Sequence, residues 1–341
     1  MMKRMVAAAA AAVVVSGIAG TAHAGPDLDA IKARGQLICG VTTGIAGFSL
    51  ADSQGKWKGL EVDVCRAVAA ALFGDSEKVK YVPTTAQQRF TALQSKEVDV
   101  LSRTTTYTLT RDTALGFDFT GVTYYDGQGF MVPKKLGVKS AKELNGATVC
   151  VQPGTTTELN LADYFRANKM TFKPVVIENL EEIRQAFFSG RCDVYTTDAS
   201  GLYATRAANA PKPDDYLILP EIISKEPLGP VVRHGDNQWA DIVRWALFAM
   251  VEAEEYGITS KNVDEMLKSD NPNIKRIVGA TPGMGKALGL DEKWAYNIIK
   301  QVGNYGEAFE RNVGIETPLK IERGLNALWT KGGLQYAPPI R

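Results

Sequence analysis

The sequence predicts an α/β protein of two lobes, each a mostly parallel sheet flanked by helices, followed by a helical C-terminal extension. Strand and helix patterns alternate from residue 36 onward, and the alternation starts again after Pro133. Beyond residue 232 the pattern becomes helical. Strand–helix alternation of this kind is typical of parallel sheets with helices on both faces.

The first half contains three strand patterns and two helix patterns. Val64, Val68 and Leu72 recur every four residues, which places them on one face of a helix that ends at Gly74. The Gly-rich loop 43–47 follows the first strand. The expected strands are 36–42, 78–82 and 98–102, and the expected helices are 61–73 and 86–95.

The second half repeats this design. Asn179, with Glu182 three residues later, caps an expected helix. Residues 93–100 match residues 187–194 in type and spacing, because each stretch is a helix end, a tight turn and an Asp-Val strand start. The match indicates two lobes of one design, although any strand–helix unit resembles another to this extent. The expected strands are 147–152, 173–177 and 192–197.

Two stretches, 128–133 and about 224–232, are candidate crossings between the lobes. If both cross, lobe 2 (132–225) is an insertion in lobe 1, which then comprises 25–131 and 226–341 with the extension. Amphipathic helices are expected in the extension, where apolar residues recur at helical spacing over 239–251 and 291–302.

The N-terminus is typical of a secretory signal peptide. Lys3 and Arg4 precede an apolar run over 5–20, and Ala22-His23-Ala24 provides small residues for cleavage. The run is short for a membrane anchor, which is the alternative. Cleavage near Gly25 lowers the formal charge from +1 to −1, since the segment holds two basic residues and no acidic one. A nearly neutral chain has no general attraction for nucleic acid or for an anionic membrane.

All four cysteines, Cys39, Cys65, Cys150 and Cys192, lie after the cleavage site. In an oxidising compartment we expect one disulfide within each half, with buried free thiols as the alternative. The pattern Cys-x-x-Cys is absent from the sequence, and His234 is the one histidine of the mature chain. These counts argue against a histidine-based metal site and against Ser-His or Cys-His catalysis.

Three polar segments follow predicted strands, where open α/β sheets bind their ligands. The first is the threonine-rich stretch 102–112, in which Arg111 could bind a carboxylate bidentately. The second is Gly154–Glu158, a helix start whose backbone N–H groups attract an anion. The third ends at Asp198, which could accept an ammonium group. Each segment alone is explained by a polar turn or a helix cap, but together they match the requirements of an amino-acid zwitterion.

The sequence resembles family 3 of the periplasmic solute-binding proteins, the polar amino-acid receptors of ABC importers. Gly59–Val64 resembles the family's signature, and the three polar segments follow in the family's order and spacing. The resemblance covers about 36–260, and the tail, with 294–297 and 304–307, is similar to the general L-amino-acid-binding branch. It implies the two-lobed type II periplasmic binding protein fold.

The resemblance also implies roles for individual residues. Arg111 binds the α-carboxylate with the backbone at Thr106 and Thr156, while Asp198 and the Thr104 carbonyl bind the α-ammonium group. Ile45 stands where many members have an aromatic residue. Arg103 either favours acidic or polar ligands or bridges the lobes. The candidate ligand-binding residues are Arg111, Asp198, Thr104, Thr106, Thr155, Thr156, Ile45, Phe48 and Arg103.

The implied function is the periplasmic substrate-binding component of an ABC importer, a monomer without cofactor or metal. It would bind free L-amino acids, of broad or of polar and acidic specificity, by lobe closure and deliver them to a permease. A periplasmic dehydratase of a small carboxylate and a ligand-presenting protein for a chemoreceptor are the alternatives. The stretch 279–287 resembles a phosphate loop but has Ala280 and Ala287 where that pattern needs Gly and Ser or Thr. The transporter's ATPase is therefore expected on another chain.

Overall fold

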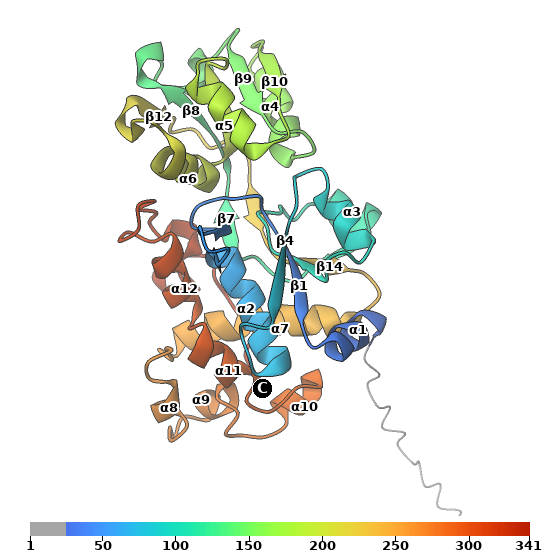
Figure 1. Ribbon diagram of the computed structural model, residues 1–341. Helices are drawn as coiled ribbons and strands as arrows, with labels where there is room; N and C mark the ends of the chain where they lie inside the picture. Colours follow the sequence, from blue (N-terminus) through green and yellow to red (C-terminus); the bar gives the residue numbers. More distant parts are fainter. Residues whose placement is uncertain (1–24) are drawn as a thin grey trace, which may run out of the picture.

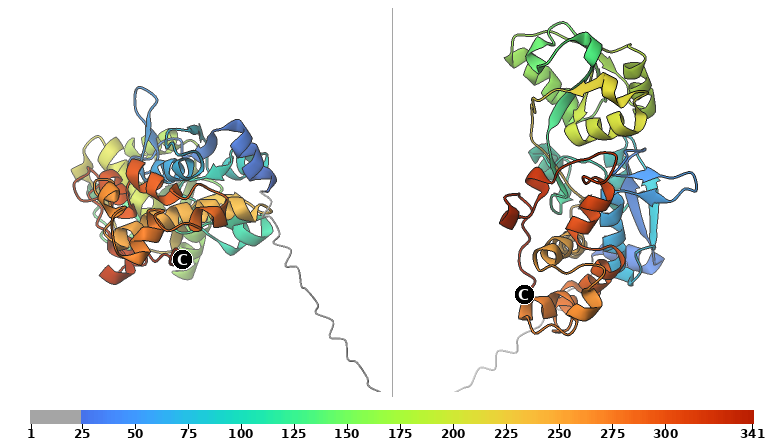
Figure 2. Two further views of the ribbon diagram at one scale, coloured as in Figure 1. Left: turned by 90° about the horizontal axis from the view of Figure 1, so that it is seen from below. Right: turned by 90° about the vertical axis from the view of Figure 1, so that its left-hand side faces the viewer.

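The computed structural model describes residues 25–341, and the predicted signal peptide lies outside the described residues. Two α/β lobes are stacked along the long axis of the molecule, with the helical extension against the side of lobe 1 (Figures 1 and 2). The predicted fold class is confirmed. Among residues 25–341, no helix combines the length and the apolar character that crossing a membrane requires.

The sheet of lobe 1 has five strands, four of which run in one direction. β14, the first strand of the chain's return to lobe 1, is antiparallel to both of its neighbours. The strand order is β4 (Val79–Pro83), β1 (Leu37–Val41), β5 (Val100–Leu101), β14 (Val231–Arg233) and β6 (Phe117–Phe119). The accompanying helices are α1 (Pro26–Arg34), α2 (Leu60–Phe73), α3 (Arg89–Gln94) and α7 (Asn237–Glu255). A small hairpin pairs β2 (Leu50–Ala51) with β3 (Trp57–Lys58).

The sheet of lobe 2 follows the same plan. Its strand β8 is the first strand after the chain enters lobe 2, and it is antiparallel to both neighbours. The strand order is β10 (Lys173–Val176), β9 (Thr148–Val151), β11 (Val194–Asp198), β8 (Gln128–Pro133) and β12 (Tyr216–Ile218). The helices are α4 (Thr156–Ala167), α5 (Leu180–Phe188) and α6 (Ala199–Asn209). Apolar clusters cover both faces of this sheet, as expected when helices pack on each side.

The two crossings between the lobes are paired strands. β7 (Tyr124–Asp126) and β13 (Glu226–Leu228) form an antiparallel ribbon between the lobes (Figure 1). Because β8 already belongs to the second sheet, the lobe boundary that we expected after residue 131 falls inside a strand. The chain leaves lobe 1 about five residues earlier, at the end of β7.

The C-terminal extension packs on lobe 1 and then reaches the crossing strands. Its helices are α8 (Val263–Met266), α9 (Pro272–Ile277), α10 (Met284–Leu288), α11 (Trp294–Gln301) and α12 (Tyr305–Asn312). They share one core with α2 and α7 around the buried Trp239. Asn326 accepts a hydrogen bond from the backbone N–H of Tyr125 at 2.7 Å, and the Tyr305 hydroxyl donates to the Thr123 carbonyl at 2.7 Å. The extension therefore holds the start of β7 in place.

The predicted pairing of cysteines within each half is confirmed. Cys39 is bonded to Cys65 in lobe 1, and Cys150 is bonded to Cys192 in lobe 2. Each disulfide ties a strand of its sheet to a segment beside it, so each lobe carries its own covalent link. The alternative of buried free thiols is wrong.

Candidate ligand-binding site

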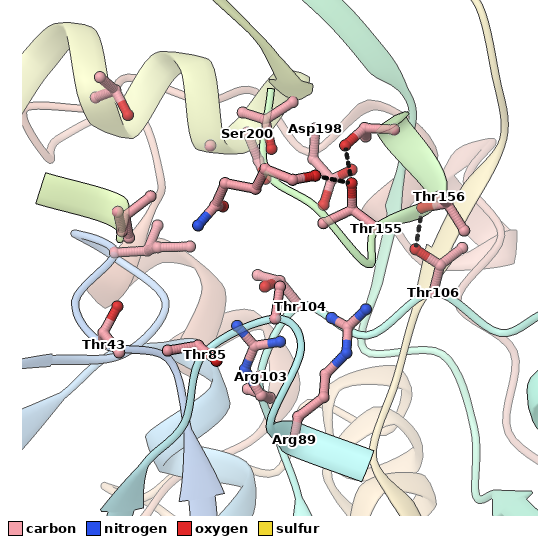
Figure 3. A pocket seen from close by; sticks show the side chains of 18 of the residues that line it. Thr43, Thr85, Arg89, Arg103, Thr104, Thr106, Thr155, Thr156, Asp198 and Ser200 are labelled. Carbon is pink, nitrogen blue, oxygen red and sulfur yellow. Dashed lines mark hydrogen bonds between the residues drawn. The ribbon is translucent and has the colours of Figure 1, made fainter. Parts of the chain in front are cut away.

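A cavity between the lobes brings together seven of the nine predicted site residues (Figure 3). Polar side chains line it from both lobes, and Arg89 and Arg103 from lobe 1 face Asp198 and Ser200 from lobe 2. The lobes touch around it, because Arg184 of lobe 2 donates to the Gly44 carbonyl of lobe 1 at 3.0 Å. The predicted residues that line the cavity are Ile45, Arg103, Thr104, Thr106, Thr155, Thr156 and Asp198.

Phe48 and Arg111 do not line this cavity. Phe48 is buried in the core of lobe 1, where its ring packs edge-on against Tyr124 at 5.3 Å between centroids. We expected it to face the ligand, and its apolar packing explains why it points inward. Arg111 lies in a π-helical turn (Thr110–Ala114) behind Thr106, and its Nη1 donates to the Thr106 carbonyl at 2.8 Å.

Asp198 is available to a ligand because another carboxylate caps its helix. Asp198 occupies the N-cap position of α6, yet its side chain accepts no capping hydrogen bond. The backbone N–H of Ser200 instead points at Asp126 of β7, at 3.3 Å from Oδ2. An acid at this position would ordinarily cap the helix, but here Asp126 provides the cap. The Asp198 carboxylate instead faces the cavity.

The acids around Asp198 make it a strong cation site. Burial raises the pKa of Asp198 well above its usual range, and the neighbouring carboxylates of Asp126 and Glu226 raise it further. Burial likewise raises the pKa of Asp126 to about 6, opposed by hydrogen bonds from Ser200 and Gly127. A cation placed beside these acids favours their ionised forms, so it binds best when they have lost their protons.

This arrangement predicts that amino-acid binding releases protons. The ligand's ammonium group stabilises the ionised carboxyls, so affinity is highest above the raised pKa values of Asp198 and Asp126, of which that of Asp126 is about 6, and falls as the pH is lowered through them. Calorimetry in two buffers of different ionisation enthalpy measures the proton count. A proton count of zero, with an affinity that stays constant between about pH 8 and about pH 5, would contradict this account of the acids.

The start of α4 faces the same cavity. Thr155 caps the helix by accepting from the Glu158 backbone N–H at 3.1 Å, and Thr155, Thr156 and Thr157 all line the cavity. The first backbone N–H groups of a twelve-residue helix carry partial positive charge, which favours a carboxylate in front of them. This end of the cavity is therefore suited to an anion.

Glu226 joins the two lobes next to this helix start. Its carboxylate accepts from the hydroxyl of Thr106 in lobe 1 at 2.6 Å and from that of Thr156 in lobe 2 at 2.8 Å. Asn160 of α4 also donates to it at 2.7 Å. Because Glu226 belongs to the crossing strand β13, these bonds hold α4 and the threonine-rich segment together at the hinge.

Arg111 contributes its charge from behind this segment. Its guanidinium group lies over the Phe90 ring at 5.2 Å, and burial lowers its pKa while the charges of Glu226 and Asp198 oppose that effect. The same positive charge lowers the pKa of Asp198. A cation behind one wall of the cavity and an anion on the other wall therefore act on one another, as a zwitterion site requires.

Thr104 adopts a backbone conformation that is rare for a residue with a side chain. Its φ is +39°, in the left-handed region, and its backbone N–H donates to the buried Glu61 carboxylate. Burial raises the pKa of Glu61 to about 7. Conformations of this kind cost about 1–3 kcal/mol and persist where surrounding contacts hold them, often at functional sites.

Sequence reasoning missed four residues of the site: Arg89, Arg184, Asp126 and Glu226. Arg184 had a detectable signal, since it falls on the same face of α5 as the buried Leu180 and Phe187. A charged residue on an apolar helix face has to find a partner. The two acids had no such signal, because their role depends on how β7 and β13 meet across the crossing.

The loop that resembles a phosphate loop is filled by a side chain of the protein. The Glu292 carboxylate accepts from the backbone N–H groups of Gly283 and Gly285 at 3.0 Å each, and from that of Lys286 at 3.2 Å. These bonds lower the pKa of Glu292. The donors that a phosphate would need are occupied, in agreement with the sequence argument against a nucleotide site.

The sequence matches the model of a known protein family. Residues 37–262 match the model of the bacterial extracellular solute-binding proteins, family 3. The chain belongs to this family. The matched residues of this solute-binding protein include the five-stranded sheets of both lobes, both crossing strands and every residue of the candidate site.

Two relatives match this chain over all or nearly all of its length. The general L-amino acid-binding periplasmic protein AapJ of Rhizobium johnstonii is 60% identical over 100% of both chains. The glutamate/glutamine/aspartate/asparagine-binding protein BztA of Rhodobacter capsulatus is 60% identical over 95% of this chain and 96% of its own. Both are named as binding proteins, which removes support from the dehydratase alternative.

A solved structure agrees with the fold described here. It is an ABC transporter periplasmic binding protein from Brucella ovis with glutathione bound, and it is 61% identical in sequence. The TM-score is 0.90, and the match covers 92% of this chain and 99% of that one. The helical extension is thus shared with that relative, since the lobes alone would cover less of the chain.

Proposed function

We propose that this solute-binding protein is the periplasmic component of an ABC importer and binds free L-amino acids between its lobes. The observation that carries the proposal is Asp198, a half-buried carboxylate that does not cap its own helix and that faces arginines across the interlobe cavity. The amino-acid ligands in the names of AapJ and BztA support it.

The ligand's main-chain groups are bound at two places in the cavity. The α-ammonium group pairs with Asp198 and the Thr104 carbonyl. The α-carboxylate lies before the first turn of α4, at Thr155 and Thr156, on the side of Thr106 and the Arg111 charge. Ile45 contacts the ligand from lobe 1. Recognition of groups that every amino acid shares explains how one site serves several of them.

Closure of the lobes couples binding to transport. Asp198 and the start of α4 belong to lobe 2, whereas Thr104, Thr106 and the Arg111 charge belong to lobe 1, so an open protein makes only part of these contacts. Closing brings both charges to the ligand and excludes water, which strengthens both interactions. The ligand's greater affinity for the closed state shifts the population toward it, and the permease recognises that shape.

Export and assembly follow from the same proposal. Residues 1–24 direct the chain to the periplasm and are removed, which leaves a chain of about 317 residues. The mature protein is a monomer that docks on a permease in the inner membrane, and the ATPase is a separate chain.

A thermal-shift screen tests the proposal. We expect the common L-amino acids of the preferred class to raise the midpoint of unfolding, because a ligand at 100 times its Kd stabilises the folded state by about 2.7 kcal/mol. Carboxylic acids of the same shape without the amine are expected to give a much smaller shift at the same concentration, because they bind more weakly. If no L-amino acid stabilises the protein, or if the amine makes no difference, the proposed function is wrong.

A further inference from the structure

Three buried arginines around the cavity have hydrogen-bond donors that nothing in the described chain accepts. Arg89 and Arg103 come from lobe 1 and Arg184 from lobe 2, and their relative exposures are 3%, 7% and 6%. Among residues 25–341, no acceptor reaches Nε of any of the three or Nη1 of Arg103. Leaving a charged donor buried without a partner costs free energy. All three side chains line the ligand cavity, where a bound molecule can supply the acceptors.

Arg184 marks the end of the cavity opposite the start of α4. Its Nη2 donates to the carbonyl of Gly44, and with Thr43 and Thr85 it also lines a small adjoining hollow. In Figure 3, Thr43 and Thr85 lie on the far side of the cavity from Thr106 and Thr156, and Arg103 lies between the two ends. A ligand whose α-carboxylate lies at α4 therefore extends its side chain toward Arg103 and Arg184.

The acids nearby do not satisfy these two arginines. Glu61 is the acid whose charge acts most strongly on Arg103, yet its oxygens accept from the Thr104 backbone and from the Ser49 hydroxyl at 3.2 Å. Burial lowers the pKa of Arg103 to about 10 and also lowers that of Arg184. Both side chains carry a positive charge at neutral pH, because the guanidinium group of arginine stays protonated in proteins. Two buried cations with free N–H groups favour an anion over a neutral polar group.

We infer that Arg103 and Arg184, one from each lobe, form a subsite for a carboxylate on the ligand's side chain, so that the preferred ligands are acidic amino acids. The inference rests on the proposed function, since it assumes that Asp198 and α4 hold the main-chain groups. The subsite would let the protein distinguish acidic from neutral amino acids, which recognition of the main-chain groups alone cannot do. Neutral amino acids then bind through their main-chain groups alone.

The test compares L-glutamate with L-2-aminobutyrate, which lacks only the side-chain carboxylate. In the wild-type mature protein we expect calorimetry to show about 10- to 100-fold tighter binding of glutamate. Arg184→Gln is expected to remove most of this preference while changing the affinity for 2-aminobutyrate by less than about 3-fold. Arg166→Gln is the matched control, because Arg166 is an exposed lobe 2 arginine on α4 and should change neither affinity.

Arg184→Lys separates charge from geometry. It keeps the positive charge and is expected to retain more of the glutamate preference than Arg184→Gln. Equal weakening of both ligands by Arg184→Gln would mean that Arg184 acts only through its bond to Gly44 during closure, and the subsite would be wrong. A wild-type protein without glutamate preference would also overturn the inference. Failure of the wild type to bind either ligand would instead contradict the proposed function, and the subsite with it.

Discussion

Asp198→Asn is expected to weaken the binding of L-glutamate by at least about 30-fold, because removing one partner of a buried, hydrogen-bonded ion pair costs about 2–5 kcal/mol. The Asp198 carboxylate has no capping bond to α6, so its loss should leave the helix intact. Asp126 continues to accept from the Ser200 N–H. Calorimetry on the mature protein, with circular dichroism to confirm folding, measures the effect.

The control for Asp198→Asn is glutarate, which is glutamate without the amine. Its binding should change by less than about 3-fold or improve, because the substitution removes a negative charge from a site that then meets only carboxylates. Asp214→Asn, at an exposed position of lobe 2, should leave both affinities unchanged. Equal weakening of glutamate and glutarate would show that Asp198 does not recognise the ammonium group.

Arg111→Ala is the second large effect that we expect, with glutamate affinity reduced by about 10- to 100-fold. The substitution removes the positive charge behind Thr106. The negative charge of the buried Glu226 is then no longer offset by Arg111, so it repels the ligand's α-carboxylate more strongly. The substitution also frees the Thr106 carbonyl from its hydrogen bond. Both changes weaken the same end of the site.

L-Isoglutamine, the α-amide of glutamate, distinguishes a charge effect from a general loss of structure. The wild type should prefer glutamate to isoglutamine, and Arg111→Ala should lose most of that preference. Arg89→Ala is the informative comparison, since Arg89 lines the cavity directly and Arg111 does not. If Arg89→Ala abolishes the preference and Arg111→Ala leaves it unchanged, Arg89 is the partner of the α-carboxylate.

The order of strands and helices could be predicted from the sequence because each element has its own local signal. The helix predicted at 61–73 and the strand predicted at 36–42 agree with α2 and β1 within one residue at each end. The lobe boundary could not be predicted as well. β8 continues directly from the crossing strand β7, and whether its residues pair with lobe 1 or lobe 2 depends on β11, a strand distant in sequence.

The candidate site could be predicted only as far as its residues follow strand ends. Thr104, Thr155 and Asp198 satisfy that rule and line the cavity. Arg184 lies within a helix, and Glu226 lies in the second crossing, so neither follows the rule. Phe48 does follow a strand, but its side chain packs in the core against the ring of Tyr124. Tyr124 is distant in sequence, so this contact could not be predicted from the residues around Phe48.

A crystal structure of the complex with L-glutamate would show which groups of the protein bind the two ends of the zwitterion. We expect the α-ammonium nitrogen to lie within hydrogen-bond distance of the Asp198 carboxylate, with the α-carboxylate before the first turn of α4 on the side of Thr106. A glutamate molecule bound outside the interlobe cavity, or bound inside it with the ammonium group away from Asp198, would contradict the account.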